Sequence, residues 1–279
     1  MNDLSRRIVV SSISIAVVIC LLLFAFQSLF QYVVVTAIMA LAGIAIWEYE
    51  QFVKAKGGRM IMPALIILTV AEVLAFFLDA KNPALESLPV IVFFIAFLIL
   101  FALHFGEKDG AIVDLAVSSF GLLYIAVPMG MILGILYMPG VDGRWWIAYL
   151  LAVTKITDIG AYFAGSLWGR RKLAPSISPK KTIEGAIFGL VCAMLASLIF
   201  YFGSDYAGPF HRGTFEWLFL GLILGAVGQF GDLSESLLKR DANKKDSNAL
   251  PGLGGVLDSI DSILFNTTII YIYLQFIKI

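Results

Sequence analysis

The sequence predicts an all-α, polytopic integral membrane protein, and three observations support this fold class. Hydrophobic residues make up 60% of the 279 residues, and charged residues make up only 14%. The mean hydropathy is +0.91, which does not fit a protein whose whole surface faces water. Apolar runs of about 20 residues, the length that a helix needs to cross a bilayer, recur along the chain.

Nine apolar runs are interpreted as membrane spans, taken in order from the N-terminus. The first run follows Arg6 and Arg7 but has no small-residue cleavage site after it, so we interpret it as a retained helix and not as a signal peptide. The second run is short and the fifth is long, so their ends are approximate. The predicted spans are 8–26, 32–47, 60–78, 88–105, 115–138, 145–168, 183–202, 215–231 and 256–277.

Basic residues predict the orientation of these spans, because cytoplasmic loops carry an excess of Lys and Arg. With the N-terminus in the cytoplasm, most of the 20 Lys and Arg residues fall in cytoplasmic segments. Lys155 lies within a span, and the residues left for the opposite face are Lys81, Arg144, Arg212 and Lys278. We therefore expect a cytoplasmic N-terminus and an extracytoplasmic C-terminus, in a bacterial inner (plasma) membrane.

The composition also limits the number of domains and the classes of partner that we expect. The chain is expected to form a single membrane domain, 1–279, in which 1–140 supplies scaffold spans and 141–279 supplies catalytic spans and cytoplasmic loops. The 20 basic residues are balanced by 20 acidic ones, so no nucleic-acid partner is expected. Cys20 and Cys192 lie in apolar runs without neighbours at metal-ligand spacing, which argues against a disulfide scaffold or a zinc site.

Ionisable residues inside the spans cost at least about 2.5 to 3.5 kcal/mol each on insertion scales, so each needs a partner or a function. Glu72 and Asp114, in the N-terminal spans, are interpreted as acids that hydrogen-bond to neighbouring helices. In the sixth span, Lys155, Asp158 and Tyr162 share one helical face. This face is either a neutralised pair that joins two helices or part of a site reached from the cytoplasm, and the sequence leaves both readings open.

The connection between the sixth and seventh spans is basic. Its cations would by default attract anionic lipids at the cytoplasmic surface. However, Ser178 and Pro179 can begin the next helix, and the first-turn amides of that helix would suit a phosphate group. Lys180, Lys181 and Thr182 would then lie beside the phosphate. Glycines spaced four apart in the following span, as elsewhere in this half, indicate close helix packing.

A more specific pattern follows the eighth span. Asp232, Glu235, Ser236 and Lys239 recur on one helical stripe, although a solvated helix end could also carry such charges. The loop 251–255 then contains three glycines, which let the backbone approach a ligand closely and offer amides to phosphate oxygens. The two features together favour a phosphate-handling site over a solvated surface.

Two more acids, Asp258 and Asp261, begin the ninth span at i, i+3 spacing. Acids at a helix N-terminus can be no more than partners of the helix dipole. Here they add to Asp232 and Asp246, and several carboxylates near basic residues suit Mg²⁺, which binds one or two carboxylates together with substrate phosphates. The pattern therefore indicates phosphoryl or nucleotidyl transfer at the membrane surface.

These residues closely resemble the signature of the phosphatidate cytidylyltransferase (CDP-diacylglycerol synthase) family. The resemblance lies in the C-terminal half of the chain. It implies a Mg²⁺-dependent reaction in which CTP and phosphatidic acid give CDP-diacylglycerol and pyrophosphate. The matching segments are 236–240, 245–246, 251–255 and 258–261, with less specific blocks at 158–162, Gly165 and 178–185.

Roles follow from the resemblance and from the charge pattern. Catalytic roles are expected for Asp232, Ser236, Lys239, Asp246, Asp258 and Asp261, and we hypothesise that Asp232, Asp258 and Asp261 hold one or two Mg²⁺ ions. Substrate binding is expected at Asp158, Lys180, Lys181, Thr182, Arg240, Lys245, Gly252, Gly254 and Gly255. Membrane lipids are expected neighbours, and both a second, monovalent ion and a homodimer are left open.

The signature departs from the family pattern at three places. The family usually has His where Leu253 stands and Arg where Ser259 stands, and the stretch between Asp246 and Pro251 is one residue shorter here. All the metal-type carboxylates are kept, which favours an active enzyme. One alternative is a CTP-dependent lipid kinase, which would leave CDP. The other, a secondary transporter, is disfavoured because the chain lacks the paired, similar halves typical of transporters.

Overall fold

The computed structural model describes residues 3–106, 109–203, 213–244 and 255–277, and most of them are helical. The chain divides into two compact units. The first comprises Met1–Gly134 and Ala242–Ser259, and the second comprises Ile135–Asp241 and Ile260–Ile279. Helix α10 (Val256–Ile277) begins in the first unit and continues in the second, so the two units share one helix.

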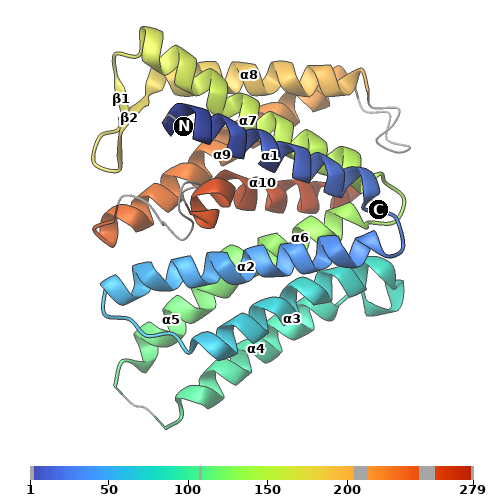
Figure 1. Cartoon of the computed structure of the whole chain (residues 1–279), viewed down its shortest axis with the longest axis vertical. Coiled ribbons are helices and arrows are strands. Elements are labelled where there is room, and N and C mark those ends of the chain that lie inside the picture. Colours follow the sequence, from blue (N-terminus) through green and yellow to red (C-terminus); the bar gives the residue numbers. More distant parts are fainter. Residues whose placement is uncertain (1–2, 107–108, 204–212, 245–254, 278–279) are drawn as a thin grey trace. The chain divides into compact units, whose positions relative to one another are not determined.

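The first unit is built from helices that pack in sequence order, α2 against α3 and α3 against α4 (Figure 1). Prolines lie in the first turns of α3 and α4, where the missing N–H has no intrahelical partner to lose. A π-helical segment, Leu122–Ala126, joins α5 to α6 without a break. The helices are α1 (Asp3–Phe24), α2 (Phe30–Ala55), α3 (Met62–Lys81), α4 (Leu88–His104), α5 (Ala111–Gly121) and α6 (Val127–Leu136), with a 3-10 turn at Pro83–Leu85.

The second unit contains three long helices, a hairpin and the larger part of α10, and α8 packs against both α7 and α9 (Figure 1). The interfaces are close because glycines face backbone. A Cβ built on Gly185 would lie 2.6 Å from the carbonyl oxygen of Ala161, so α7 and α8 could not approach this closely with a larger residue. The elements are α7 (Gly143–Trp168), β1 (Lys172–Ala174), β2 (Ser178–Thr182), α8 (Ile183–Tyr201) and α9 (Thr214–Asp241).

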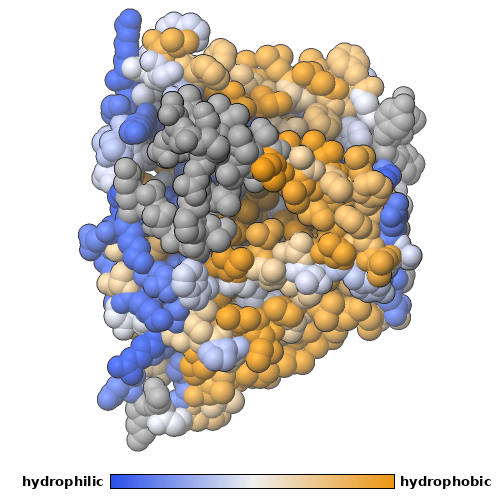
Figure 2. Space-filling model, in the orientation of Figure 1, coloured by the Kyte–Doolittle hydropathy of each residue, from blue (hydrophilic) through white to orange (hydrophobic). Residues whose placement is uncertain are grey.

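The expectation of a helical integral membrane protein is confirmed. Within the described residues, six helices are long and apolar enough to cross a membrane, and Leu88–His104 and Ile15–Phe24 are shorter apolar helices. Large apolar side chains are exposed along these helices, for example Phe94 at 62% and Leu98 at 67%. In Figure 2, hydrophobic residues cover the helix flanks, and hydrophilic residues gather toward the helix ends. Such surfaces suit lipid and not water.

Each predicted span overlaps a helix of the described chain, but two details differ. The second span is longer than expected, because α2 continues to Ala55 through the buried acids Glu48 and Glu50. The helix expected to start at Ser178 and Pro179 is wrong. These residues begin strand β2, which pairs antiparallel with β1, and α8 starts only at Ile183.

Candidate active site

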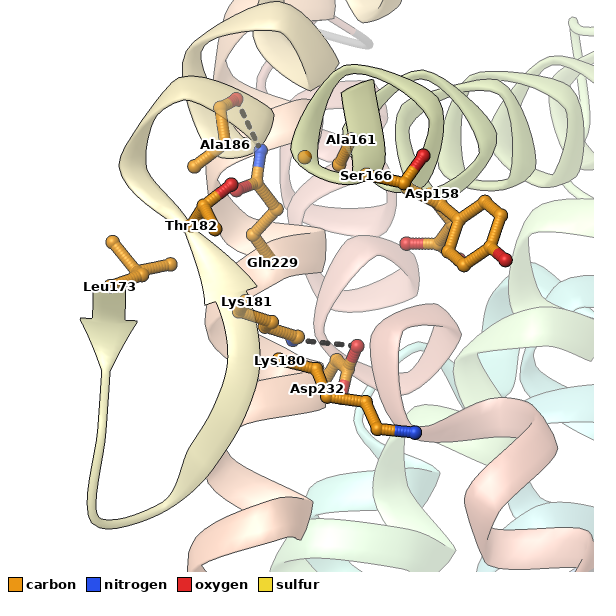
Figure 3. A pocket seen from close by; sticks show the side chains of 12 residues that line it. Asp158, Ala161, Ser166, Leu173, Lys180, Lys181, Thr182, Ala186, Gln229 and Asp232 are labelled. Carbon is orange, nitrogen blue, oxygen red and sulfur yellow. Dashed lines mark hydrogen bonds and ion pairs between the residues drawn. The ribbon is translucent and has the colours of Figure 1, made fainter. Parts of the chain in front are cut away.

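The second unit contains a cavity of about 570 Å³, bounded by α7, the β1–β2 hairpin, α8 and α9 (Figure 3). Five residues predicted for the site line this cavity, so the structure brings the sixth span, the basic connection and the eighth span together. The lining residues are Asp158, Ala161, Tyr162, Gly165, Ser166, Leu173, Lys180, Lys181, Thr182, Ala186, Gln229 and Asp232.

The β1–β2 hairpin supplies the basic wall of the cavity. Lys181 reaches Asp232 of α9, with 2.6 Å between the ammonium nitrogen and a carboxylate oxygen (Figure 3). Both side chains are partly exposed, at 26% and 35%, so a ligand in the cavity can reach this ion pair. Lys180, the neighbouring strand residue, is exposed and also lines the cavity.

This ion pair is part of a larger cluster of charges, which we call the acid–lysine cluster: Lys155, Asp158, Lys181, Asp232 and Asp261. Asp158 interacts electrostatically with Lys155, one turn away on α7, and with Asp232 and Lys181. Asp261, on α10, interacts with Asp232, Asp158 and Lys155. Three acids and two lysines therefore lie in one cluster, and a bound cation would favour the charged form of these acids.

Close approach of α9 and α10 brings Asp232 and Asp261 into one cluster. Gly231 immediately precedes Asp232, and a Cβ built on it would lie 2.9 Å from the backbone oxygen of Asp261. A larger residue at 231 would push the two helices apart. Asp261 is only 8% exposed, and its Oδ1 accepts a hydrogen bond from the N–H of Ser262.

The predicted stripe on α9 forms internal pairs. The Ser236 hydroxyl donates to Asp232 Oδ1 at 3.4 Å, which places Ser236 beside the acid–lysine cluster. Lys239 contacts the carboxylate of Glu235, which is fully buried. Lys239 was expected to serve a substrate, and in the structure its ammonium also neutralises a buried acid, which is a structural duty.

The phosphate site predicted beside Lys180, Lys181 and Thr182 stays a prediction, but the two lysines belong to a strand and not to the first turn of α8. Thr182 is instead the residue that precedes the helix, and its hydroxyl oxygen accepts a hydrogen bond from Gly185 N–H at 3.1 Å. This is an N-cap contact. Thr182 still lines the cavity, so both lysines reach the predicted location from the strand.

Two contacts fix the hairpin to the helices. Arg240, near the end of α9, donates from Nε to the carbonyl oxygen of Ile177 in the hairpin turn at 3.1 Å. At the base of the hairpin, Glu184 accepts from the backbone N–H groups of Arg170 and Arg171, each at 3.1 Å. Arg240 was expected to bind substrate, whereas its Nε here holds the element that carries Lys180 and Lys181.

The start of α10, in the first unit, carries two further predicted residues. Gly255 N–H donates to Asp258 Oδ2 at 3.2 Å, so one oxygen of Asp258 caps its own helix, which was the alternative reading of this acid. Glu48 was not predicted at all. Its two carboxylate oxygens accept from Val256 N–H at 2.9 Å and from Leu257 N–H at 2.7 Å. Glu48 directly follows the predicted end of the second span. An acid at the end of an apolar run was the one feature of the sequence that could have pointed to it.

The remaining predicted residues are Lys245, Asp246, Gly252 and Gly254, and they lie outside the described residues. Within the described residues, no three His, Cys, Asp or Glu side chains are grouped as ligands of one metal ion. Mg²⁺ commonly takes only one or two carboxylates, with water and phosphate oxygens completing its shell. The hard carboxylate oxygens of Asp232 and Asp261, which lie in one cluster, fit that kind of binding.

Comparison with known proteins identifies the family. The profile of the cytidylyltransferase family matches residues 5–277, nearly the whole chain. The chain is a member of the cytidylyltransferase family. The sequence resemblance is thereby confirmed, and it extends to the N-terminal spans, where no signature residue was recognised. The cavity and the acid–lysine cluster are therefore features of a cytidylyltransferase.

Individual relatives of this cytidylyltransferase cover most of its length. A phosphatidate cytidylyltransferase of Chlamydia muridarum is 33% identical over 97% of the chain and 92% of the relative. One from Chlamydia trachomatis is 34% identical with the same coverage of 97% and 92%. A phosphatidate cytidylyltransferase of Bacillus subtilis is 44% identical over 133 residues, which is 47% of the chain and 48% of the relative.

Proposed function

We propose that this cytidylyltransferase transfers a cytidylyl group from CTP to phosphatidic acid, giving CDP-diacylglycerol and pyrophosphate. The observation that carries the proposal is the cavity in which Lys180, Lys181, Asp158 and Asp232 meet. It offers cations for phosphate groups beside acids that can share a divalent cation. Full-length relatives that bear the name phosphatidate cytidylyltransferase support the choice of substrates.

The reaction needs no nucleophile from the protein. An oxygen of the lipid phosphate attacks the α-phosphorus of CTP, the bond from that phosphorus to the bridging oxygen of the β-phosphate breaks, and pyrophosphate leaves. A phosphate monoester is already anionic at neutral pH, so the chain contributes chiefly by positioning and by balancing charge. Lys180 and Lys181 are the cations placed to hold phosphate oxygens in the cavity.

The lysines are assigned to phosphate oxygens, and the acids of the site are assigned to the metal ion. We propose that Asp232, Asp258 and Asp261 hold Mg²⁺ together with phosphate oxygens. The bound ion would neutralise charge on the attacking and leaving oxygens. Ser236, which donates to Asp232, would keep that carboxylate oriented. Lys181 neutralises Asp232 in the structure, and its ammonium is well placed to turn toward a substrate phosphate once a cation balances the acid.

We further propose that all nine helical segments cross the membrane, with the N-terminus and the active site on the cytoplasmic side of a bacterial plasma membrane. The basic residues support this orientation, since clusters of Lys and Arg occur on the hairpin and after α9. CTP is a cytoplasmic, charged nucleotide, so a cavity on that side would be open to it. Cysteine accessibility labelling at position 176 in the hairpin turn would test the assignment.

One assay tests the activity. Purified protein in detergent is incubated with labelled CTP and phosphatidic acid, with and without Mg²⁺, and both products are measured. The proposal requires that CDP-diacylglycerol and pyrophosphate accumulate together and only with Mg²⁺. Accumulation of CDP with a phosphorylated lipid would indicate the lipid kinase instead. Failure to consume CTP under any of these conditions would contradict the proposed function.

A further inference from the structure

We propose that Glu48 is a positioning residue that fixes the start of α10 and thereby the acids of its first two turns. The proposal rests on the proposed function, because Asp258 and Asp261 are assigned there to Mg²⁺. Glu48 lies on α2, in a span whose acids the sequence did not connect with the site. It is separated by 208 residues from Val256, whose N–H it accepts.

The contact with Glu48 supplies the N-terminal cap that the residue before α10 cannot provide. The first N–H groups of a helix have no intrahelical partner and are normally capped by a side chain of the preceding residue. That residue is Gly255, which has no side chain. Both oxygens of Glu48 take over the task, at 2.9 Å from Val256 N and 2.7 Å from Leu257 N. Two bonds to one planar carboxylate fix the helix start in direction as well as in position.

Burial makes the contact rigid. Glu48 is 0% exposed, and Leu257 is 0% exposed, so water does not compete for these hydrogen bonds. A carboxylate at a helix N-terminus is also favoured by the helix dipole. The charge of Glu48 is therefore part of its function, because a neutral amide has one acceptor oxygen in place of two and interacts less strongly with the dipole.

The same face of α2 contacts the chain before the helix as well. Phe52 lies one turn after Glu48, and the ammonium of Lys244 stands 5.8 Å from the centre of its ring. Lys244 and Val256, the described residues on the two sides of segment 245–254, therefore both contact α2, at Phe52 and at Glu48. Asp258 lies within a turn of the anchored amides, so displacement of the helix start moves this acid directly.

The experiment compares Glu48→Gln with Glu50→Gln. Glu50 is a matched control, because it lies two residues further on the same helix, its side chain is 5% exposed, and its carboxylate pairs with Lys54 at 2.9 Å. In Glu48→Gln we expect faster amide hydrogen exchange in the peptide that begins at Gly255. We also expect kcat to fall about tenfold or more and half-activation by Mg²⁺ to need several-fold more ion. Glu50→Gln should leave both the exchange and the Mg²⁺ requirement unchanged.

Glu48→Asp is the second variant, which covers the case in which Glu48→Gln does not fold. It keeps the charge and shortens the side chain by one methylene, so its exchange rate and Mg²⁺ requirement should lie between those of the wild type and a full loss. Unchanged exchange at the start of α10 would overturn the anchor. Faster exchange with a wild-type Mg²⁺ requirement would overturn the positioning role. A wild type that makes no CDP-diacylglycerol would contradict the proposed function alone, because the exchange measurement still decides the anchor.

Discussion

Lys181 and Asp232 form an ion pair in the cavity wall, with 2.6 Å between nitrogen and oxygen, and they come from a two-stranded hairpin and a long helix. This pair joins the basic and acidic parts of the site. A phosphate group and a divalent cation together could replace it, the phosphate on the lysine and the cation on the acid.

Removing the lysine should affect substrate use directly. In Lys181→Ala, the cavity loses a phosphate partner, and Asp232 loses its counter-charge. We expect kcat/KM for CTP or for phosphatidic acid to fall by about tenfold to a hundredfold. Steady-state kinetics with each substrate varied in turn would show which one Lys181 serves. Lys172→Ala, an exposed lysine on the partner strand, should leave both values near wild type.

Removing one acid should change the metal requirement. Asp261→Asn keeps the size of the side chain but removes the charge that interacts with Asp232 and Asp158. We expect product formation to fall by more than about a hundredfold, or to need much higher Mg²⁺ concentrations. A Mg²⁺ titration of CDP-diacylglycerol formation measures both effects. Near-normal turnover at an unaltered Mg²⁺ requirement would disprove the metal assignment, and Asp109→Asn, an exposed acid, serves as the control.

Arg240 offers a test of how the hairpin is held. Without its hydrogen bond to the Ile177 carbonyl, the hairpin turn should exchange its amide hydrogens faster. We expect KM to rise by about threefold to tenfold in Arg240→Ala while kcat changes less, because the lysines of β2 become less ordered. The control is Arg170→Ala, an exposed arginine at the hairpin base whose backbone N–H, and not its side chain, donates to Glu184. Unaltered exchange in the hairpin would argue that Arg240 acts on substrate alone.

Helix packing around the cavity can be tested by stability. In Gly185→Ala, the added Cβ would meet the carbonyl oxygen of Ala161 at 2.6 Å, so α7 and α8 must separate. We expect a loss of about 1 to 3 kcal/mol in the free energy of unfolding, measured by denaturant or thermal unfolding in detergent. Gly43→Ala on α2 is the matched control, because no atom lies within 4 Å of the added Cβ. That substitution should be neutral or slightly stabilising.

Hydropathy and local spacing were sufficient for much of the fold and site. The apolar runs predict where the helices lie, because lipid-facing helices are apolar on most sides. Local spacing also predicts correctly that Ser236 and Asp232 meet on one turn of α9, since residues four apart on a helix are neighbours. The cavity is lined by Asp158, Lys180, Lys181, Thr182 and Asp232, five residues for which the family resemblance and the charge pattern predict a place in the site.

Contacts between distant segments could not be predicted in the same way. Ser178 followed by Pro179 has the composition of a helix start, yet pairing of Thr182 with Lys172 makes the segment a strand, and a two-stranded sheet leaves an edge that tolerates proline. Glu48 was missed because a prediction of spans from hydropathy ends the span at the first acidic residue. Its partners, Val256 and Leu257, offer only backbone N–H groups, which no residue pattern reveals.

Helix α10 has a consequence for the way this enzyme can be taken apart. Its first residues belong to the unit of Met1–Gly134, and its remainder belongs to the other unit. A truncation that keeps every signature residue but deletes the early spans would also delete the cap supplied by Glu48. Chimeras that exchange these spans between homologues should work only when the donor restores an equivalent carboxylate, so we expect that the half of the chain that carries the signature does not function without the early spans.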